Sequence, residues 1–512
     1  MDILMKIFSL KFIDILFKLF PEIILTIAII FKIIIISSTK NIKELKNAFY
    51  FLFIFSIIFT IISLFSQLYF TFNQNDLSDL SLILNNAIVY SVTSFEIISK
   101  IFISILAIIL ASISSVYFSL NNSNIEYEHR YFRLEYLPLF LIVMLGSFML
   151  VSANDLLTFL IGFELVAVPS YFIIALDNKN KIALEGSIKY FLIGSISTIS
   201  IILGILIFYI FNGNFLYNSL TNLNLVSLKL AFLFILIGII LKLGIFPFSF
   251  WIQDAYYASR APYLLIISTL PKYSVLLALV KILSYINDGY FKVLLSVFAV
   301  LSMVMGVFWA LNENDIKKII AYSTIFNMGF VLIPFTGFDL SQKIYVLSLI
   351  NFYVFQYVLS TILVLGVLLY LEEKYDTTDL LKLKGSLSNN KVLAFLLILG
   401  LLSIAGLPPT VGFIAKFFVL VFSYTFNPVL VIIAIIFSIA SLYYYYRIAK
   451  ELYVEKDFSL NSDFSNLNFS LNNSFLYYVS LFSVSVLLII WGLLPYFITE
   501  TFYHIAYIIS KF

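Results

Sequence analysis

Seven lysines lie inside long apolar runs of this chain, and their amines are the first candidates for chemistry. A charge within a membrane-spanning segment is costly, so it usually marks a functional site. Lysine can release its proton when it is desolvated, whereas arginine effectively cannot. All seven cations in the runs are lysines, which favours proton transfer: Lys32, Lys100, Lys189, Lys242, Lys272, Lys281 and Lys416.

Lys272 and Lys242 occupy positions from which an amine cannot easily reach water. Lys272 lies ten residues into a predicted span at 262–284, too deep for its side chain to extend to the membrane surface. Lys242 precedes Pro247 in the stretch LKLGIFPFSFW. Because proline cannot donate to the carbonyl four residues back, we expect the carbonyl of Leu243 to be free beside the Lys242 amine.

Lys416 follows a second proline break, in the stretch AGLPPTVGFIAKFF. Pro408 and Pro409 are expected to free the carbonyls of Ile404 and Ala405. Interrupted helices persist in a bilayer where the freed groups line a cavity or meet protein partners. We therefore assign Lys416, with Lys242 and Lys272, to a predicted proton relay.

Glu164 is the acidic residue best placed to influence these amines. It lies in the middle of a span, in the stretch LIGFELVAVPSYF, and Lys242 is its expected partner. Glu22 and Glu135 open predicted spans, where a negative charge is favourable at the positive end of the helix dipole.

The remaining lysines have simpler interpretations. Lys189 and Lys281 lie near span ends, from which their long side chains can reach the membrane surface. Glu96 and Lys100 are four residues apart, as are Glu185 and Lys189, a spacing that favours an ion pair on one helix face. We therefore expect structural roles for Lys32, Lys100, Lys189 and Lys281.

The composition shows what must position these side chains. Of the 512 residues, 62% are hydrophobic and only 12% are charged, against roughly half and a quarter in soluble domains. Apolar runs of about 18–25 residues, long enough to cross a bilayer, recur throughout. The chain is therefore predicted to be a single all-α membrane domain (1–512) with about fourteen transmembrane helices. We place them at 21–38, 47–70, 96–119, 134–153, 156–176, 187–211, 230–251, 262–284, 293–311, 319–337, 344–371, 392–423, 427–446 and 475–499, after an amphipathic lead-in at 1–20.

Several partners and cofactors are not expected. A net charge of +3 does not suggest nucleic acid as a partner, whereas membrane lipids are expected along the apolar helices. The absence of cysteine excludes cysteine-ligated iron–sulfur clusters. The two histidines, His129 and His504, lie in a loop and in the tail. We expect this chain to bind no metal and no redox cofactor of its own.

The loops differ strongly in positive charge. Those after the odd-numbered spans hold 17 lysines and arginines, and the other side holds 7. Positive loops face the cytoplasm or the mitochondrial matrix, so both termini are expected on the opposite side, the intermembrane space or periplasm.

The two proline breaks divide the chain into similar halves. They fall in spans 7 and 12, five spans apart. We therefore predict two inverted five-helix repeats, at 134–284 (spans 4–8) and 293–446 (spans 9–13). In transporters built this way, the broken helices mark the transport site.

The residues around these breaks resemble a known family. The stretches SANDLLTFLIGFELVAVPSYFIIAL, LKLGIFPFSFWIQDAYYASRAP, PKYSVLLALVKIL, NENDIKKIIAYSTIFNMGFVLI and LLSIAGLPPTVGFIAKFFVL are similar to the proton-antiporter-like subunits of respiratory complex I, an NADH:ubiquinone oxidoreductase. The resemblance covers roughly 134–450 and, more loosely, the rest. It implies a proton-translocating membrane-arm subunit that carries no redox chemistry itself, in a complex that uses NADH, FMN, iron–sulfur clusters and ubiquinone elsewhere.

Within that family the chain resembles the subunit 2 branch. The pair Pro271-Lys272 and the lysine at 416 are typical of this branch, and too few residues follow Thr499 for the long lateral helix of subunit 5. The resemblance implies an ion pair of Glu164 with Lys242, a central relay at Lys272 and an exit-side lysine at Lys416. Asn327 departs from the pattern, because related chains often have histidine there.

The branch implies partners and a location as well. The expected partners are the other membrane-arm subunits, especially antiporter-like subunit 4 and the small membrane subunits. The expected location is the mitochondrial inner membrane, or a bacterial plasma membrane.

Two other functions fit the same pattern. The chain could belong to a multisubunit Na⁺/H⁺ antiporter, which shares the fold, or it could be a non-pumping membrane scaffold. Co-purifying flavin and iron–sulfur subunits would identify complex I, and loss of pumping after lysine substitution would exclude the scaffold.

Overall fold

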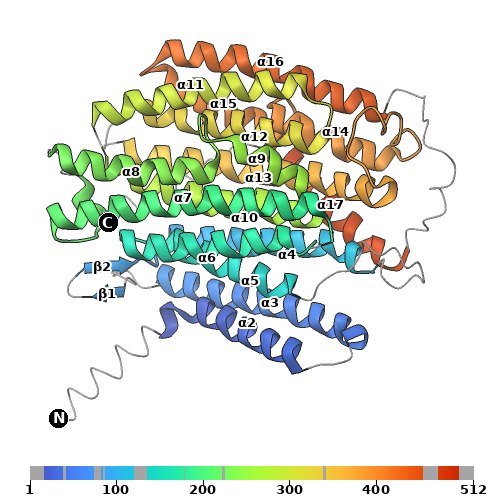
Figure 1. Cartoon of the computed structure of the whole chain (residues 1–512), viewed down its shortest axis with the longest axis horizontal. Coiled ribbons are helices and arrows are strands. Elements are labelled where there is room, and N and C mark those ends of the chain that lie inside the picture. Colours follow the sequence, from blue (N-terminus) through green and yellow to red (C-terminus); the bar gives the residue numbers. More distant parts are fainter. Residues whose placement is uncertain are drawn as a thin grey trace.

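A computed structural model describes residues 16–38, 42–73, 82–84, 87–119, 135–177, 179–221, 225–286, 288–337, 342–453 and 471–494. The predicted lead-in at 1–20 lies mostly outside these residues, and both histidines lie outside them. The helices run side by side, with α2 and α3 at one edge of the bundle and α16 at the other (Figure 1).

The described helices follow the predicted order of spans. They are α2 (Phe20–Ser38), α3 (Ile42–Asn73), α4 (Ser94–Ser119), α5 (Tyr136–Ser152), α6 (Leu156–Ala175), α7 (Lys181–Asn212), α8 (Val226–Leu243), α9 (Phe250–Ala258), α10 (Ala261–Leu283), α11 (Gly289–Asn312), α12 (Ile316–Leu332), α13 (Lys343–Tyr375), α14 (Lys391–Ala405), α15 (Val411–Tyr424), α16 (Pro428–Tyr453) and α17 (Leu471–Leu493). Twelve helices of the described part are long and apolar enough to cross a membrane, and α5, α14 and α15 are shorter apolar helices. The chain is thus a multi-pass, mostly helical membrane protein.

A few short elements complete the described part. Strands β1 (Leu82–Leu84) and β2 (Ala87–Tyr90) form an antiparallel hairpin before α4. Two 3-10 helices, η2 (Tyr217–Thr221) and η3 (Ile333–Thr336), lie in connections. The hairpin is a small departure from the predicted all-α fold, and it positions Tyr90 beside the start of α4.

The core of the bundle is formed by helices that have no apolar face left for lipid. The spanning windows of α10 and α13 are 100% buried and that of α12 is 94% buried, whereas α7 is only 33% buried. An apolar helix inside the bundle buries side chains on every face, and one at its edge exposes them to lipid. Lys272 therefore lies on a central helix.

Both predicted breaks occur, and both follow the same local design. The first divides span 7 into α8 and α9, and the second divides span 12 into α14 and α15. Each upstream half ends at a glycine with positive φ, Gly244 (67°) or Gly406 (83°). That left-handed conformation suits glycine and ends the helix just before the prolines.

The same local arrangement of an aspartate at the start of a helix occurs in both predicted repeats. Asp155 caps α6 by accepting from the N–H of Thr158, and Asp315 caps α12 by accepting from those of Lys317 and Lys318. The backbone of each aspartate also forms an isolated β-bridge to the segment after the next α-helix, Asp155 with Leu216 and Asp315 with Asp379. The two segments that hold these aspartates therefore share one local design, while the predicted inverted repeats at 134–284 and 293–446 remain a prediction.

Candidate functional site

Lys242 lies in the last turn of α8, where the helix ends at Gly244. A cation there is favourable because unpaired carbonyls give this end of a helix a partial negative charge. The side chain of Trp251, on α9, donates from Nε1 to the carbonyl of Leu241 at 2.8 Å, which fixes one half of the broken helix against the other. The break thus holds the Lys242 amine inside the bundle, where the residue is only 5% exposed.

The Lys242 amine is surrounded by aromatic rings. Its Nζ donates to Tyr171 Oη at 3.3 Å and lies 4.6 Å from the centroid of that ring and 4.5 Å from that of Tyr190. Phe163 is 6.0 Å away. Ring faces attract a cation, by about 2 kcal/mol where water is excluded. This cage accommodates the charged amine without a direct carboxylate contact.

Glu164 is half-buried on α6 and accepts a hydrogen bond from Thr198 of α7. The ion pairs of the described residues do not include the expected Glu164–Lys242 contact. Tyr171, seven residues after Glu164 on the same helix face, contacts the amine instead. The two charges therefore interact at longer range than a direct pair.

Lys272 follows Pro271 on α10 and donates to the hydroxyl of Tyr256 on α9. Its Nζ lies 4.6 Å from the centroid of the Tyr256 ring. A small cavity of about 10 Å³ is lined by both Lys242 and Lys272, with Tyr190 and Trp251 among its other walls. A cavity of about this size holds about one water molecule.

Lys416 lies on α15 and donates to the carbonyl of Ala405, the last residue of α14, at 3.0 Å. The Ala405 carbonyl, which the prolines were predicted to free, thus accepts a hydrogen bond from the amine. The Nζ also lies 5.2 Å and 5.7 Å from the rings of Phe326 and Phe330 on α12. The residue is 5% exposed.

Buried polar groups occupy the space between Lys272 and Lys416. Tyr256, the partner of Lys272, lies beside Thr324, whose hydroxyl is 2.9 Å from that of Tyr357 on α13. Asn327, one turn after Thr324, accepts from Tyr353 at 2.9 Å and donates to the carbonyl of Ser323. Asn327 thus completes a hydrogen-bonded network, but its amide cannot carry a proton as histidine does.

A larger charged cavity of about 770 Å³ lies where the loops after α6, α9, α11 and α13 meet. Lys317 pairs with Glu372 at 2.6 Å on its wall, and Glu372 also accepts from the N–H of Ala261, the first residue of α10. Burial raises the pKa of the Asp315 carboxyl in the same cavity. Water and protons can therefore approach the helix of Lys272 from this end.

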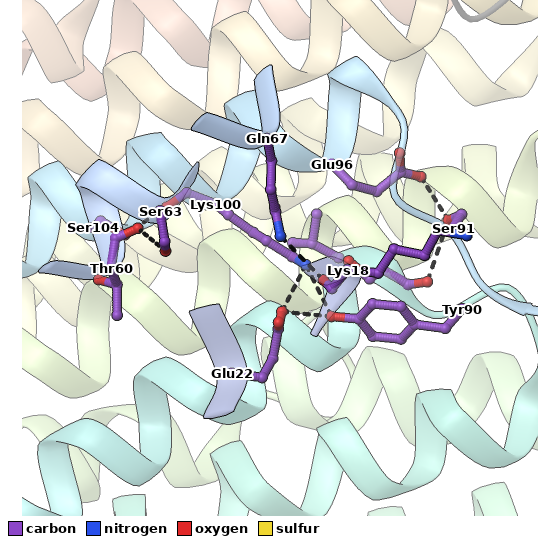
Figure 2. Close-up of polar contacts among 12 residues, drawn as sticks. Lys18, Glu22, Thr60, Ser63, Gln67, Tyr90, Ser91, Glu96, Lys100 and Ser104 are labelled. Atoms are coloured by element: carbon purple, nitrogen blue, oxygen red, sulfur yellow. Dashed lines mark hydrogen bonds and ion pairs between the residues drawn. The ribbon is translucent and has the colours of Figure 1, made fainter. Parts of the chain in front are cut away.

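Two of the lysines expected to be structural, Lys100 and Lys281, have other partners than their positions in the sequence predict. The predicted pair of Lys100 with Glu96 is wrong: Lys100 Nζ lies 2.7 Å from Glu22 Oε1 on α2 (Figure 2). Glu96 pairs with Lys281 at 2.9 Å, so Lys281 does not extend to the membrane surface. Packing of α4 between other helices brings these more distant charges closer than the local one.

The other two lysines expected to be structural lie in different surroundings. Lys189 pairs with Glu185 at 2.8 Å, as its spacing predicts, and also with Asp254 at 3.0 Å. Lys32 is buried, with its Nζ 5.4 Å from the centroid of the Phe53 ring.

The tyrosines around the amines are the functional candidates that sequence reasoning missed. Tyr171 and Tyr190 contact Lys242, and Tyr256 contacts Lys272. In a chain with 34 tyrosines, no single one stands out. The seven-residue spacing from Glu164 to Tyr171 is the one signal that could have identified a member of this group.

The side chains considered as possible metal ligands are those of His, Cys, Asp and Glu. Within the described residues, no three His, Cys, Asp or Glu side chains gather as a metal site would require.

Comparison with known proteins places these features in a family context. Residues 153–442 match the family described as NADH:quinone oxidoreductase/Mrp antiporter, transmembrane. A relative from Francisella tularensis subsp. holarctica, named NADH-quinone oxidoreductase subunit N, is 29% identical over 451 residues, which cover 85% of this chain and 88% of that protein.

Solved structures share the fold. A chain of respiratory complex I from Thermus thermophilus superposes with a TM-score of 0.72 at 20% identity, covering 94% of this chain and 98% of that chain. A chain of the Mrp complex from Dietzia sp. gives 0.80 at 16% identity, covering 96% and 97%. At these identities the likeness extends to the fold alone.

Proposed function

Because this chain belongs to the NADH:quinone oxidoreductase and Mrp antiporter transmembrane family, we propose that it is a proton-pumping membrane-arm subunit of complex I. It corresponds to subunit N of the bacterial enzymes and to antiporter-like subunit 2. It works within an NADH:quinone oxidoreductase, and the redox reaction takes place on other subunits. Without cysteine, the chain cannot hold a cysteine-ligated cluster, and we assign it no cofactor.

The observation that carries this proposal is the cavity shared by Lys242 and Lys272. Two buried lysines on different helices line a space that accommodates about one water molecule. A desolvated lysine can release its proton. Two amines that can exchange protons, beside one water-sized space, are what a proton relay requires.

We assign a role to each residue from its surroundings. Protons enter through the charged cavity near the start of α10 and reach Lys272. Glu164 acts on the proton occupancy of Lys242 through its charge, and Tyr171 contacts the amine directly. The polar groups around Thr324 and Tyr357 lead from Tyr256 toward Lys416. Lys416 holds the proton against the Ala405 carbonyl before its release.

Substitution of Lys272 and Lys416 by arginine and by alanine tests this relay. Arginine keeps the charge but cannot release the proton, and alanine removes both. We expect all four variants of the assembled complex to pump fewer protons per NADH oxidised. Proton translocation and quinone reductase activity are measured together. Normal pumping by Lys272→Arg and Lys416→Arg would overturn the relay, because charge alone would then suffice.

We also propose which subunits contact the chain, which membrane holds it and on which side its termini lie. Its neighbours are antiporter-like subunit 4 and the small membrane subunits, in the mitochondrial inner membrane or a bacterial plasma membrane. Both termini face the intermembrane space or periplasm, as the loop charges favour. Labelling of residues 374–391 from the matrix or cytoplasmic side tests this topology, and labelling from the opposite side alone would contradict it.

A subunit of an Mrp-type Na⁺/H⁺ antiporter is the second candidate, favoured by the TM-score of 0.80 with the Dietzia chain. Relatives named NADH-quinone oxidoreductase subunit N, among them the Francisella protein at 29% identity, favour complex I. Purification of the native assembly decides between them, because flavin and iron–sulfur subunits accompany only complex I.

A further inference from the structure

Four buried charges lie outside the relay described above, at the end of the bundle where α2 and α4 begin and α10 ends. Their side chains are 0% (Lys100), 8% (Glu22), 5% (Glu96) and 13% (Lys281) exposed. They form two ion pairs between helices, Glu22–Lys100 at 2.7 Å and Glu96–Lys281 at 2.9 Å. Helix α4 supplies one member of each pair.

Two consecutive residues, the last of the hairpin and the one after it, each bridge the two members of one ion pair by hydrogen bonds (Figure 2). Tyr90 donates to Glu22 Oε1 at 2.5 Å and accepts from Lys100 at 2.8 Å. Ser91 donates to Glu96 Oε1 at 2.8 Å and accepts from Lys281 at 2.7 Å. Within each pair, the amine, the hydroxyl and the carboxylate are thus in hydrogen-bond contact.

This network adjoins the relay on two helices. Lys281 and Lys272 are nine residues apart on α10, about 13.5 Å along the helix axis at 1.5 Å per residue. Tyr273, next to Lys272, lies beside Ser99, next to Lys100 on α4. The four charges therefore lie between the relay and the start of α2.

Holding helices together is a poor explanation for so many buried charges. Removing two charges from water costs about as much as their attraction returns, and well-packed apolar side chains often stabilise as well or better. Both cations are lysine, which can exchange its proton. Glu22 Oε2 is buried and has no hydrogen-bond partner among the described residues, so this carboxylate keeps an acceptor for an incoming proton.

We propose that Glu22, Tyr90, Glu96, Lys100 and Lys281 form a second proton-transfer site, which connects the lysine relay to the end of the bundle where α2 begins. The proposal rests on the pumping function proposed above. Lys281 gives its proton to Glu96, and Lys100 gives its proton to Glu22, each across the contact of its own ion pair. Each amine is then neutral and can accept a new proton, and each carboxylic acid holds one proton to release.

Arginine variants distinguish proton transfer from a purely structural role of the ion pairs between helices. Lys100→Arg and Lys281→Arg keep the positive charge and the ion pair but cannot release a proton. In complex reconstituted into liposomes, we expect the protons pumped per NADH oxidised to fall by roughly half or more, because these amines can no longer exchange protons. Lys189→Arg is the matched control, since Lys189 lies in an exposed pair, and it should pump normally.

The outcomes are distinguishable. Normal pumping by both network variants, with reduced pumping by Lys272→Arg, overturns this inference alone, whereas normal pumping by Lys272→Arg overturns the proposed function. If the arginine variants do not assemble, the double variant Glu22→Gln/Lys100→Met decides. Assembly with reduced pumping supports the proposal, and assembly with normal pumping overturns it. Failure of that variant to assemble also overturns it, because a role in folding would then explain the charges.

Discussion

The two broken helices have the same backbone design but give their lysines different surroundings. Gly244 and Gly406 end the upstream halves in the same left-handed conformation. Lys242 meets aromatic rings, a tyrosine hydroxyl and a nearby acid. Lys416 meets a freed backbone carbonyl and two phenylalanines.

The difference indicates that the break places an amine in the bundle and the neighbouring helices decide what the amine responds to. The Ala405 carbonyl accepts from Lys416 in either protonation state, so this partner is constant. Glu164 changes its influence on Lys242 when its own charge or position changes. The first site is therefore suited to switching, and the second to holding a proton. Four predictions test this contrast.

Removal of the two amines should give the largest effect. Lys242→Met and Lys416→Met should both abolish pumping through this subunit. Only Lys416→Met leaves a buried carbonyl without its donor, which costs about 1–3 kcal/mol. The thermal unfolding temperature of the solubilised complex should therefore be lowered only by Lys416→Met. An equal loss of stability in both variants would contradict the difference between the sites.

Alanine at the two cap glycines should come next. Both positions have positive φ, which costs a residue with a side chain about 1–2 kcal/mol. An added Cβ at 406 would lie 2.6 Å from Cδ of Lys416, whereas at 244 it would meet Ile252. Both variants should lose stability, but Gly406→Ala should lose severalfold more pumping, because small displacements of a reacting group are costly. Equal pumping by the two variants would show that the Lys416 side chain adapts.

Glu164→Gln should reduce pumping moderately while assembly stays normal. The substitution removes the charge that acts on Lys242 and keeps the shape that accepts from Thr198. Thr198→Val is the control, since it removes the hydrogen bond and keeps the charge, and it should pump better than Glu164→Gln. The rate of proton uptake at equal NADH oxidation is measured for both. The reverse order would assign the effect to the hydrogen bond.

Tyr171→Phe should give the smallest change. It keeps the ring contact with Lys242 and loses one hydrogen bond of 3.3 Å, which contributes about 0.5–1.5 kcal/mol. A slight slowing of pumping is expected, and Tyr171→Leu, which loses the ring as well, should slow it further. If the phenylalanine variant is as impaired as the leucine variant, the hydroxyl itself carries the proton.

The sequence alone predicted the features that depend on local chemistry. Proline fixed where spans 7 and 12 break, and the apolar runs gave the helices their approximate order and bounds. The pair of Glu185 with Lys189 followed from helical spacing, because both residues lie on one helix face. The freed carbonyl of Ala405 likewise followed from the prolines beside it.

Only the tertiary structure decided which buried groups meet. Spacing along α4 paired Lys100 with Glu96, but packing brought Glu22 and Lys281 to them from helices 78 and 185 residues away in sequence. The same applies to Tyr256 beside Lys272 and to the cavity that Lys272 shares with Lys242. A buried charge is stabilised by whichever opposite charge the packing of the helices places beside it. Spacing along the sequence predicts only contacts between residues of the same helix.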